Sequence, residues 1–302
     1  MSICISIASY RDPDLLATVN SCYDNAANKE DISFCIVSQA EEIEHPDLSH
    51  IDCPINYYRF HWSESKGLGW ARNIAINNSD ADFIMQIDSH SRFKENWYEG
   101  LLSMYGDMEK FWGNRIIVTE FPSGFDIIDG QDVFSDTTQT MKTMIEWDDD
   151  DRRFRIGDFW EEIENKVSGD EVFYIAGGFS FARSDIFKSI APDPDIYFED
   201  QISLSLMAYT RGIRMINVPR GYVYSNYSRD GRRLHWEDHP DWKDIDSISE
   251  NKLQKLYHGK LSGQFGIESM DLYNRFIKLN NIEFTDEKKS GDRFEVVERY
   301  RL

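Results

Sequence analysis

The chain has 302 residues, of which 41% are hydrophobic and 14% aromatic, and its formal net charge is -21. This length is enough for one large domain or for one and a half small ones. The electric field of this negative charge repels the phosphate backbone of nucleic acids. Non-specific nucleic-acid binding is therefore disfavoured, although a local basic patch could override this repulsion.

All four cysteines lie in the first 53 residues, and none belongs to a C-x-x-C pair. A zinc site is therefore disfavoured, and buried reduced thiols are expected. The N-terminus begins with a strand-like run and has no basic segment, and no apolar stretch approaches the roughly 18 residues of a membrane span. We expect neither a signal peptide nor a transmembrane segment, and hence a cytoplasmic protein.

Strands alternate with helices in the first part of the chain. β-rich apolar runs predict strands over residues 3–9, 32–37, 55–60 and 83–87. Apolar periodicity predicts two helices. The first is capped by Asp12 and has Pro13 at its first position, and the second covers residues 67–77. Such alternation is typical of a mostly parallel central sheet flanked by helices. Ligands then bind beyond the carboxyl ends of the strands.

The later part of the chain is less regular. Residues 120–170 are polar and acidic with weak periodicity, which indicates an inserted loop or lid. A strand-like run over 172–181, a helix over 199–211 and a strand over 213–218 follow, and beyond about 240 the chain is helical and charged. We expect an α/β catalytic domain over residues 1–238 and a helical C-terminal extension over 239–302.

Asp88-Ser89-His90 directly follows the expected strand over 83–87. An aspartate at the end of a buried strand is held rigidly at the ligand-binding edge, and His90, two positions on, can turn toward the same point. A carboxylate and an imidazole suit manganese, magnesium or a zinc-like ion, which could bridge the phosphates of a nucleotide-sugar. The alternative is an aspartate that caps a turn beside a surface histidine.

Arg72 lies one turn into the helix that begins at Gly67 and Gly69. Two glycines free the backbone at a helix start, where N–H groups favour an anion, and an arginine there could bind a phosphate bidentately. The alternative is a helix start with an ordinary surface arginine.

Glu199 and Asp200 are adjacent carboxylates at the start of a helix. One of them could orient an acceptor hydroxyl or steady positive charge at a sugar carbon. The alternative is that both stand there because the helix dipole favours acidic residues.

His235 follows a basic stretch that contains Arg229, Arg232 and Arg233. The histidine could complete a metal site, and the arginines could bind diphosphate. A basic surface loop is the alternative.

Four ordered blocks of the sequence resemble known enzymes. Residues 6–13, residues 67–73 and the segment Gln86 to His90 with the nearby Trp97 look like the polypeptide N-acetylglucosaminyltransferases, whose best-known member modifies hydroxyproline in the cytoplasm. The Asp-Ser-His segment and the block at residues 176–179 also look like the polypeptide N-acetylgalactosaminyltransferases. Both groups are retaining enzymes of the GT-A fold that use a UDP-sugar and a divalent ion.

The resemblance assigns roles to residues of this chain. Asp88 and His90 would bind manganese or magnesium, Arg72 would lie close to the nucleotide, and Gly177 and Gly178 would line the donor sugar. The uridine would lie against the end of the first strand, and Glu199 and Asp200 would face the reacting centre. The uridine-binding residues would be Ala8, Ser9, Tyr10 and Arg11, with Asp88 also near the ribose or diphosphate.

The chain departs from these families at one point. They usually carry a further metal-binding histidine after the acidic helix, and residues 222–227 contain none. Either His235 supplies the third ligand, or water does, or the affinity for metal is lower.

The leading hypothesis is a retaining transferase that moves GlcNAc or a related hexose from UDP to a hydroxyl, by front-face attack assisted by Glu199 or Asp200. The resemblance favours a protein hydroxyl as acceptor. A glycan or small molecule comes next, and a modified base of nucleic acid is disfavoured by the charge. The rivals are a non-catalytic nucleotide-sugar-binding module and a metal-dependent nucleotidyltransferase, the latter disfavoured because no phosphate-gripping glycine-rich loop follows the first strand.

Overall fold

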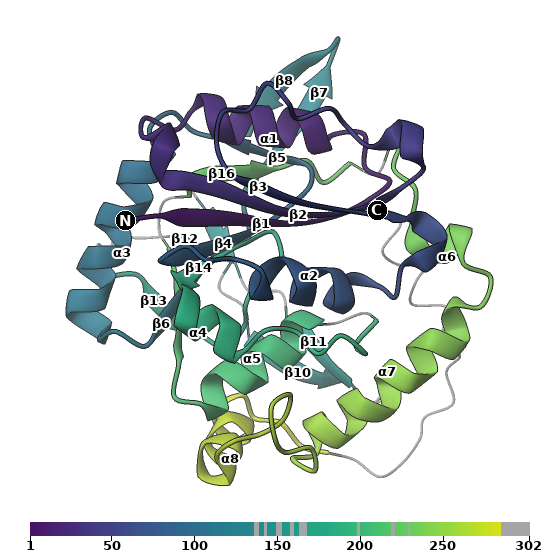
Figure 1. The fold of residues 1–302 in the computed structure, drawn as a ribbon. Coiled ribbons are helices and arrows are strands. Elements are labelled where there is room, and N and C mark those ends of the chain that lie inside the picture. The colour runs from purple at the N-terminus through teal and green to yellow at the C-terminus, as the bar shows by residue number, and fades with distance from the viewer. Residues whose placement is uncertain are drawn as a thin grey trace.

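The computed structural model describes residues 1–135, 139–141, 144–148, 153–157, 160–162, 168–197, 200–218, 221–228 and 230–284 (Figure 1). An eight-stranded sheet forms its centre, in the order β13-β15-β6-β14-β4-β1-β2-β3. The strands are β1 (Ile3–Tyr10), β2 (Ile32–Ala40), β3 (Ile55–His61), β4 (Phe83–Asp88), β6 (Ile116–Thr119), β13 (Asp170–Val172), β14 (Phe179–Arg183) and β15 (Arg214–Asn217).

The central sheet is mostly parallel, as the sequence predicts. β1 pairs in parallel with β2 and β4, β2 with β3, and β6 with β15, whereas β14 is antiparallel to both β4 and β6, and β13 is antiparallel to β15. The four strands expected in the first part of the chain are confirmed, each within a few residues of its expected bounds.

Helices cover both faces of this sheet (Figure 1). The alternation of side chains along β1 assigns the faces, because Ile3, Ile5 and Ile7 pack with α1 and α3, whereas Cys4 packs with α2. The second face also receives α4 and α5. The helices are α1 (Leu15–Asp24), α2 (Leu68–Asn77), α3 (Trp97–Trp112), α4 (Ser184–Ser189) and α5 (Asp200–Thr210).

A smaller four-stranded sheet, in the order β5-β16-β7-β8, follows the end of β4. Its strands are β5 (Ser91–Phe93), β7 (Ser123–Ile128), β8 (Gln131–Phe134) and β16 (Val223–Ser225). Residues 120–170 were expected to be a long loop, but the described residues there form strands, which also include the pairs β10 (Met144–Asp148) with β11 (Arg153–Gly157) and β9 (Gln139–Met141) with β12 (Trp160–Glu162). The sequence did not predict these strands, because they are short, several are exposed, and the region has a polar composition.

The described C-terminal part is helical, as expected, with α6 (His235–Asp238), α7 (Trp242–Tyr257) and α8 (Met270–Leu279), and residues 285–302 of the expected extension lie outside the described residues. Side chains of α7 and α8 share one apolar cluster with α5 and with Ile145 and Phe154 of the β10–β11 pair. The division of the chain at residue 238 stays a prediction.

Three further expectations concern local structure. Cys4, Cys22 and Cys35 are buried free thiols, as expected, whereas Cys53 is a free thiol that is only half-buried. The strand expected over 172–181 is split into β13 and β14. Across the ranges given above, each helix is too short or too polar to span a lipid bilayer.

Candidate functional site

The carboxyl ends of β1 and β4 meet at one edge of the central sheet. Ala8 lies beside Asp88 in the register of these two strands, and both are partly exposed. Gly178, which precedes β14, lies against Asp88 from the other side, since a Cβ built on Gly178 would come 3.2 Å from Asp88 Oδ2. The structure therefore brings three residues predicted from distant parts of the sequence to one place.

Asp88 and His90 face each other across a short gap. The Oδ2 atom of Asp88 is 3.8 Å from Nε2 of His90, and the two side chains are 30% and 21% exposed. Oδ1 of Asp88 accepts a hydrogen bond from Arg72 at 3.3 Å, and Nδ1 of His90 is 2.8 Å from Oδ2 of Asp12. A hydrogen bond thus holds Asp88 through its Oδ1 atom and His90 through its Nδ1 atom. The Oδ2 atom of Asp88 and the Nε2 atom of His90 are left to face a common point.

Asp12 holds His90 in place, a role that sequence reasoning missed. Its carboxylate also accepts from the hydroxyl of Ser89 at 2.8 Å and from the backbone N–H of Asp14 at 2.9 Å. Burial would raise the pKa of Asp12, but the hydrogen bond and charge of His90, together with the hydrogen bonds from Asp14 and Ser89, keep that pKa below its ordinary value. The helix expected to start at Pro13 begins at Leu15, with Asp14 at its cap position, although it is the Asp12 carboxylate that accepts from a backbone N–H of this turn.

The pair Asp88 and His90 has the chemistry of a divalent-metal site. A carboxylate oxygen and an imidazole nitrogen suit manganese, and a histidine whose other nitrogen is held by a carboxylate is the usual arrangement of a metal-binding histidine. The described residues contain no group of three or more His, Cys, Asp or Glu side chains placed to hold an ion. The donor atoms of Asp88 and His90 thus suit a divalent ion, to which they would supply two ligands.

Arg72 is buried, with a side chain only 3% exposed. Its guanidinium donates to both carboxylate oxygens of Asp200, at 3.1 and 3.0 Å, as well as to Asp88 and to the carbonyl of Gly177 at 3.2 Å. Rather than an open phosphate-binding group, Arg72 is the bridge that joins α2, the end of β4 and the start of α5.

Asp200 is buried beside Arg72, with a side chain 1% exposed. Its partner in the sequence prediction, Glu199, lies outside the described residues.

The close packing at Gly177, where a Cβ would come 2.9 Å from Arg72 and closer still to Gln201, explains why glycine stands at that position.

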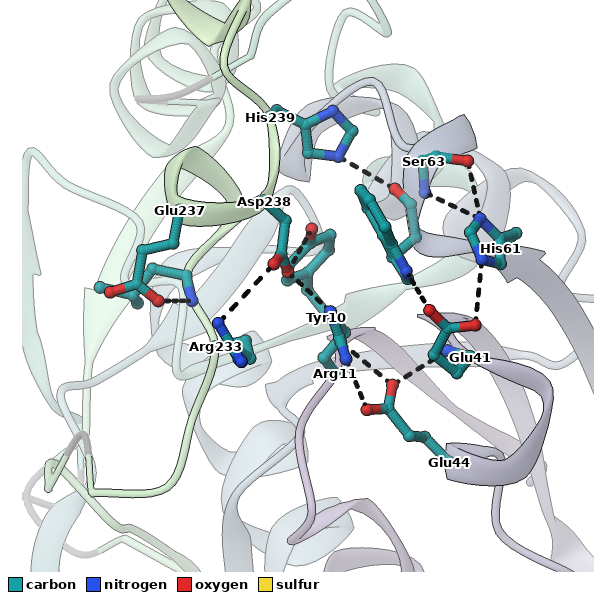
Figure 2. Close-up of polar contacts among 12 residues, drawn as sticks. Tyr10, Arg11, Glu41, Glu44, His61, Ser63, Arg233, Glu237, Asp238 and His239 are labelled. Atoms are coloured by element: carbon teal, nitrogen blue, oxygen red, sulfur yellow. Dashed lines mark hydrogen bonds and ion pairs between the residues drawn. The ribbon is translucent and has the colours of Figure 1, made fainter.

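Tyr10 and Arg11 lie at the end of β1, within a group of acidic side chains (Figure 2). Arg11 pairs with Glu44 at 2.8 Å and with Asp238 of α6 at 3.1 Å, and the Tyr10 hydroxyl donates to the same Asp238 oxygen at 3.1 Å. Arg11, which directly follows β1, adopts a positive φ of 45°. The segment that begins at α6 is therefore fixed to the sheet edge where the uridine was predicted.

His235 uses both ring nitrogens within the protein. Nδ1 is 2.7 Å from the Tyr197 hydroxyl, Nε2 is 2.9 Å from the Ser65 hydroxyl, and the ring stacks on His239 at 3.9 Å. Burial, together with His239, lowers the pKa of His235 to about 4, so the ring is neutral at physiological pH. None of these contacts joins His235 to Asp88 or His90.

Glu120 is a second acidic residue near this edge that the sequence reasoning missed. It follows β6, its backbone N–H donates to the carbonyl of Phe179, and its side chain is buried against Gly221. Its Oε1 has no hydrogen-bond partner in the described part of the chain. Burial raises the pKa of Glu120 to about 8 against a partial opposing effect of Lys94, so the carboxyl binds a proton near neutral pH. An acidic residue directly after a buried strand was the available signal.

Glu120→Gln is expected to flatten the pH dependence of stability. The folded protein binds the Glu120 proton more tightly than the unfolded chain does, so this group stabilises the fold below about pH 4.5, and that stability is lost as the pH rises through about 8. Between pH 5 and pH 9 the wild type should lose about 3 to 5 kcal/mol more than the Gln variant. Urea unfolding at both pH values measures this, with the exposed Glu30→Gln as control; identical pH dependence in Glu120→Gln and wild type would refute it.

Residues 47–285 match the family model described as Glycosyltransferase (GlcNAc). Among solved structures, GalNAc-T7 with UDP, GalNAc and Mn2+ is similar over 100% of this chain at a TM-score of 0.59 and 14% identity, and the chain spans 58% of that protein's length. S. aureus TarS is similar over 87% of this chain and 41% of its own, at a TM-score of 0.49 and 12% identity. A search of curated protein sequences finds no match.

Proposed function

Because the chain belongs to the Glycosyltransferase (GlcNAc) family and has the GT-A fold, we propose that it transfers GlcNAc or a related hexose from a UDP-sugar to a hydroxyl of a polypeptide, with retention at the anomeric carbon. The enzyme class is that of the family. The donor, the stereochemistry, the divalent ion, the acceptor and the cytoplasmic location are the proposed parts.

The observation that carries the proposal is the geometry of Asp88 and His90. Both stand beyond the carboxyl end of a central strand, their Oδ2 and Nε2 atoms are 3.8 Å apart, and separate partners hold the opposite atom of each. A divalent ion bound there would neutralise the charge that develops on the departing diphosphate. We therefore propose Asp88 and His90 as its protein ligands.

Water and nucleotide oxygens would supply the remaining ligands of such an ion. His235 as a third ligand stays a prediction, and it requires the ring to leave Tyr197 and Ser65. A ligand set of two residues predicts weaker metal binding than a set of three, which agrees with the absence of a histidine in residues 222–227.

The charges at the sheet edge favour one orientation of the nucleotide. Asp238 and Glu44 surround Arg11, and carboxylates repel a diphosphate but accept hydrogen bonds from a uracil N–H or a ribose hydroxyl. We therefore place the uridine along Ala8, Ser9, Tyr10 and Arg11, and the diphosphate at the divalent ion that Asp88 and His90 would hold. Gly178 packs closely against Asp88 and Pro122, which a Cβ there would approach to 3.2 and 3.1 Å, and we place the donor sugar next to this glycine.

Retention, with no obvious strand-borne nucleophile among the described residues, points to front-face attack. The bond between the anomeric carbon and the UDP oxygen breaks as the acceptor oxygen bonds to the same face of that carbon, and the acceptor proton passes to the departing phosphate oxygen. Asp200 is bound on both oxygens by Arg72, so we assign it to positioning Arg72 and Asp88 rather than to contact with the sugar. Glu199 remains the proposed group that assists at the reacting centre.

The test is a panel of UDP- and GDP-sugars with manganese, first without acceptor and then with serine-, threonine- and hydroxyproline-containing peptides. We expect metal-dependent hydrolysis of UDP-GlcNAc or a related UDP-hexose, and a transferred sugar that keeps its anomeric configuration by NMR. UDP binding in calorimetry without turnover of any sugar nucleotide would instead identify a non-catalytic binding module. Release of pyrophosphate from a nucleoside triphosphate would identify a nucleotidyltransferase.

A further inference from the structure

The hairpin formed by β7 and β8 projects from the body of the molecule (Figure 1). Paired residues of neighbouring strands share a face, so the register divides the hairpin into two faces. One face carries Phe125, Phe134 and Ile127, and it leads toward α1 because Arg92 lies over Phe125 and pairs with Asp14 of the helix cap.

The second face carries the other alternate residues of both strands. Asp126 opposes Val133, and Ile128 opposes Gln131. Tyr227 continues this face, because Ser225 of β16 pairs with Gly124 of β7 and the Tyr227 ring lies against Gly124, where a Cβ would come 3.5 Å from it. We call Tyr227, Gly124, Asp126, Val133, Ile128 and Gln131 the hairpin strip.

The hairpin strip carries three exposed apolar side chains on one face. Tyr227 is 57% exposed, Val133 47% and Ile128 53%. Exposed apolar residues that are contiguous rather than scattered indicate a binding surface.

The hairpin strip begins at the site already described. The Tyr227 hydroxyl donates to the carbonyl of Pro122 at 2.7 Å. A Cβ on Gly178 would meet Pro122 at 3.1 Å and Asp88 Oδ2 at 3.2 Å, so Pro122 and Gly178 connect Tyr227 to Asp88. A chain lying along the hairpin strip would therefore pass next to the proposed donor sugar.

The charge of the hairpin specifies the partner further. Asp126 and Asp129 are exposed and form no ion pair with any residue the structure describes, and the whole chain carries a charge of -21. β8 is the outer strand of its sheet as far as that sheet is described, so an extended segment beside it would present alternate side chains to this face.

We propose that the hairpin strip is the docking surface of the acceptor, and that the acceptor is an extended polypeptide segment with alternating apolar residues and with lysine or arginine. This inference rests on the polypeptide acceptor of the proposed function. The apolar residues of the acceptor contact Tyr227, Val133 and Ile128, and its basic residues lie near Asp126 and Asp129.

The test compares variants on the two faces of the hairpin. Val133→Ser with Ile128→Ser removes apolar contacts from the hairpin strip, Asp126→Lys reverses its charge, and Ile127→Ser is the matched control, because Ile127 is 47% exposed but lies on the opposite face. The probes are a synthetic peptide with one threonine among alternating leucine and lysine residues, and the same peptide with glutamate in place of lysine. Circular dichroism and urea unfolding check that each variant folds.

Two readouts separate this inference from the proposed function. Hydrolysis of the UDP-sugar without acceptor should be unchanged in all variants, because none touches Asp88 or His90. Anisotropy of the labelled lysine peptide should show binding about tenfold weaker in the double variant and in Asp126→Lys, and unchanged in Ile127→Ser, a difference of about 1.4 kcal/mol. The KM for transfer to the peptide should rise in parallel.

Several results would overturn the inference. The first is that wild type and double variant bind the peptide equally well. The second is that Ile127→Ser loses as much peptide affinity as the double variant. The third is that the wild type prefers the glutamate peptide. A concentration-dependent dimer of the wild type in ultracentrifugation that the double variant abolishes would make the hairpin strip an interface between copies instead. If the wild type hydrolyses the UDP-sugar but transfers to no peptide, the proposed acceptor fails, and anisotropy still decides whether the hairpin strip binds the peptide.

Discussion

Arg72→Met is expected to lower the free energy of unfolding by about 3 to 5 kcal/mol, because it leaves a buried carboxylate without its counter-charge. The Arg72 guanidinium is bound by Asp200 and Asp88, and Asp200 is 1% exposed. Methionine has a similar length but no charge and no donor, so Asp200 would have to take up a proton or draw in water. Urea unfolding measures the loss.

A double variant tests whether the cost comes from the unpaired charge. Asp200→Asn in the Arg72→Met background removes the buried charge, so it should recover part of the lost stability, whereas Asp200→Asn alone should destabilise the protein. Arg59→Met is the control, since Arg59 is 48% exposed and pairs with an exposed glutamate, and it should change stability by less than about 0.5 kcal/mol. If Arg72→Met changed the free energy of unfolding as little as Arg59→Met does, the Arg72 contacts between α2, β4 and α5 would not stabilise the fold.

The central fold could be predicted because its signals are local. Apolar runs such as residues 3–9 and 83–87 gave the strands, and the alternation with helices gave a mostly parallel sheet and the edge where its strands end. That edge is where the structure places Ala8, Asp88 and Gly178 together. The expectation of a loop over residues 120–170 was wrong for the residues that form hairpins, since short exposed strands lack the apolar runs on which the prediction depended.

The contacts that define the site could not be predicted in the same way. The residues that form these hydrogen bonds are far apart in the sequence. Asp12 and His90 are 78 residues apart, Arg72 and Asp200 are 128 apart, and His235 and Ser65 are 170 apart. One sequence gives residue types and local periodicity, but it does not say which charged side chains meet. Arg72 therefore looked like a phosphate-binding group and Asp12 like a helix cap, although each has carboxylate or imidazole partners elsewhere in the chain.

Asp88→Asn and His90→Ala are expected to reduce metal-dependent turnover of the UDP-sugar by at least about 100-fold. A divalent ion at a leaving diphosphate supplies several kcal/mol to the transition state, and each 1.4 kcal/mol is a factor of ten in rate. Asp12→Asn, which weakens the support of the His90 ring, should reduce metal affinity by about 10- to 100-fold and leave turnover closer to wild type at saturating manganese. His50→Ala, at an exposed histidine bonded to Asn20, is the control and should behave as wild type.

The most direct measurement is hydrolysis of UDP-GlcNAc as a function of manganese concentration, for wild type, Asp12→Asn and His90→Ala side by side. The geometry of Asp88 and His90 predicts turnover that rises with manganese in the wild type, a shift to higher manganese in Asp12→Asn, and near-complete loss in His90→Ala. Undiminished turnover in His90→Ala, or wild-type turnover that survives chelation of the metal, would contradict the assignment of Asp88 and His90 as metal ligands.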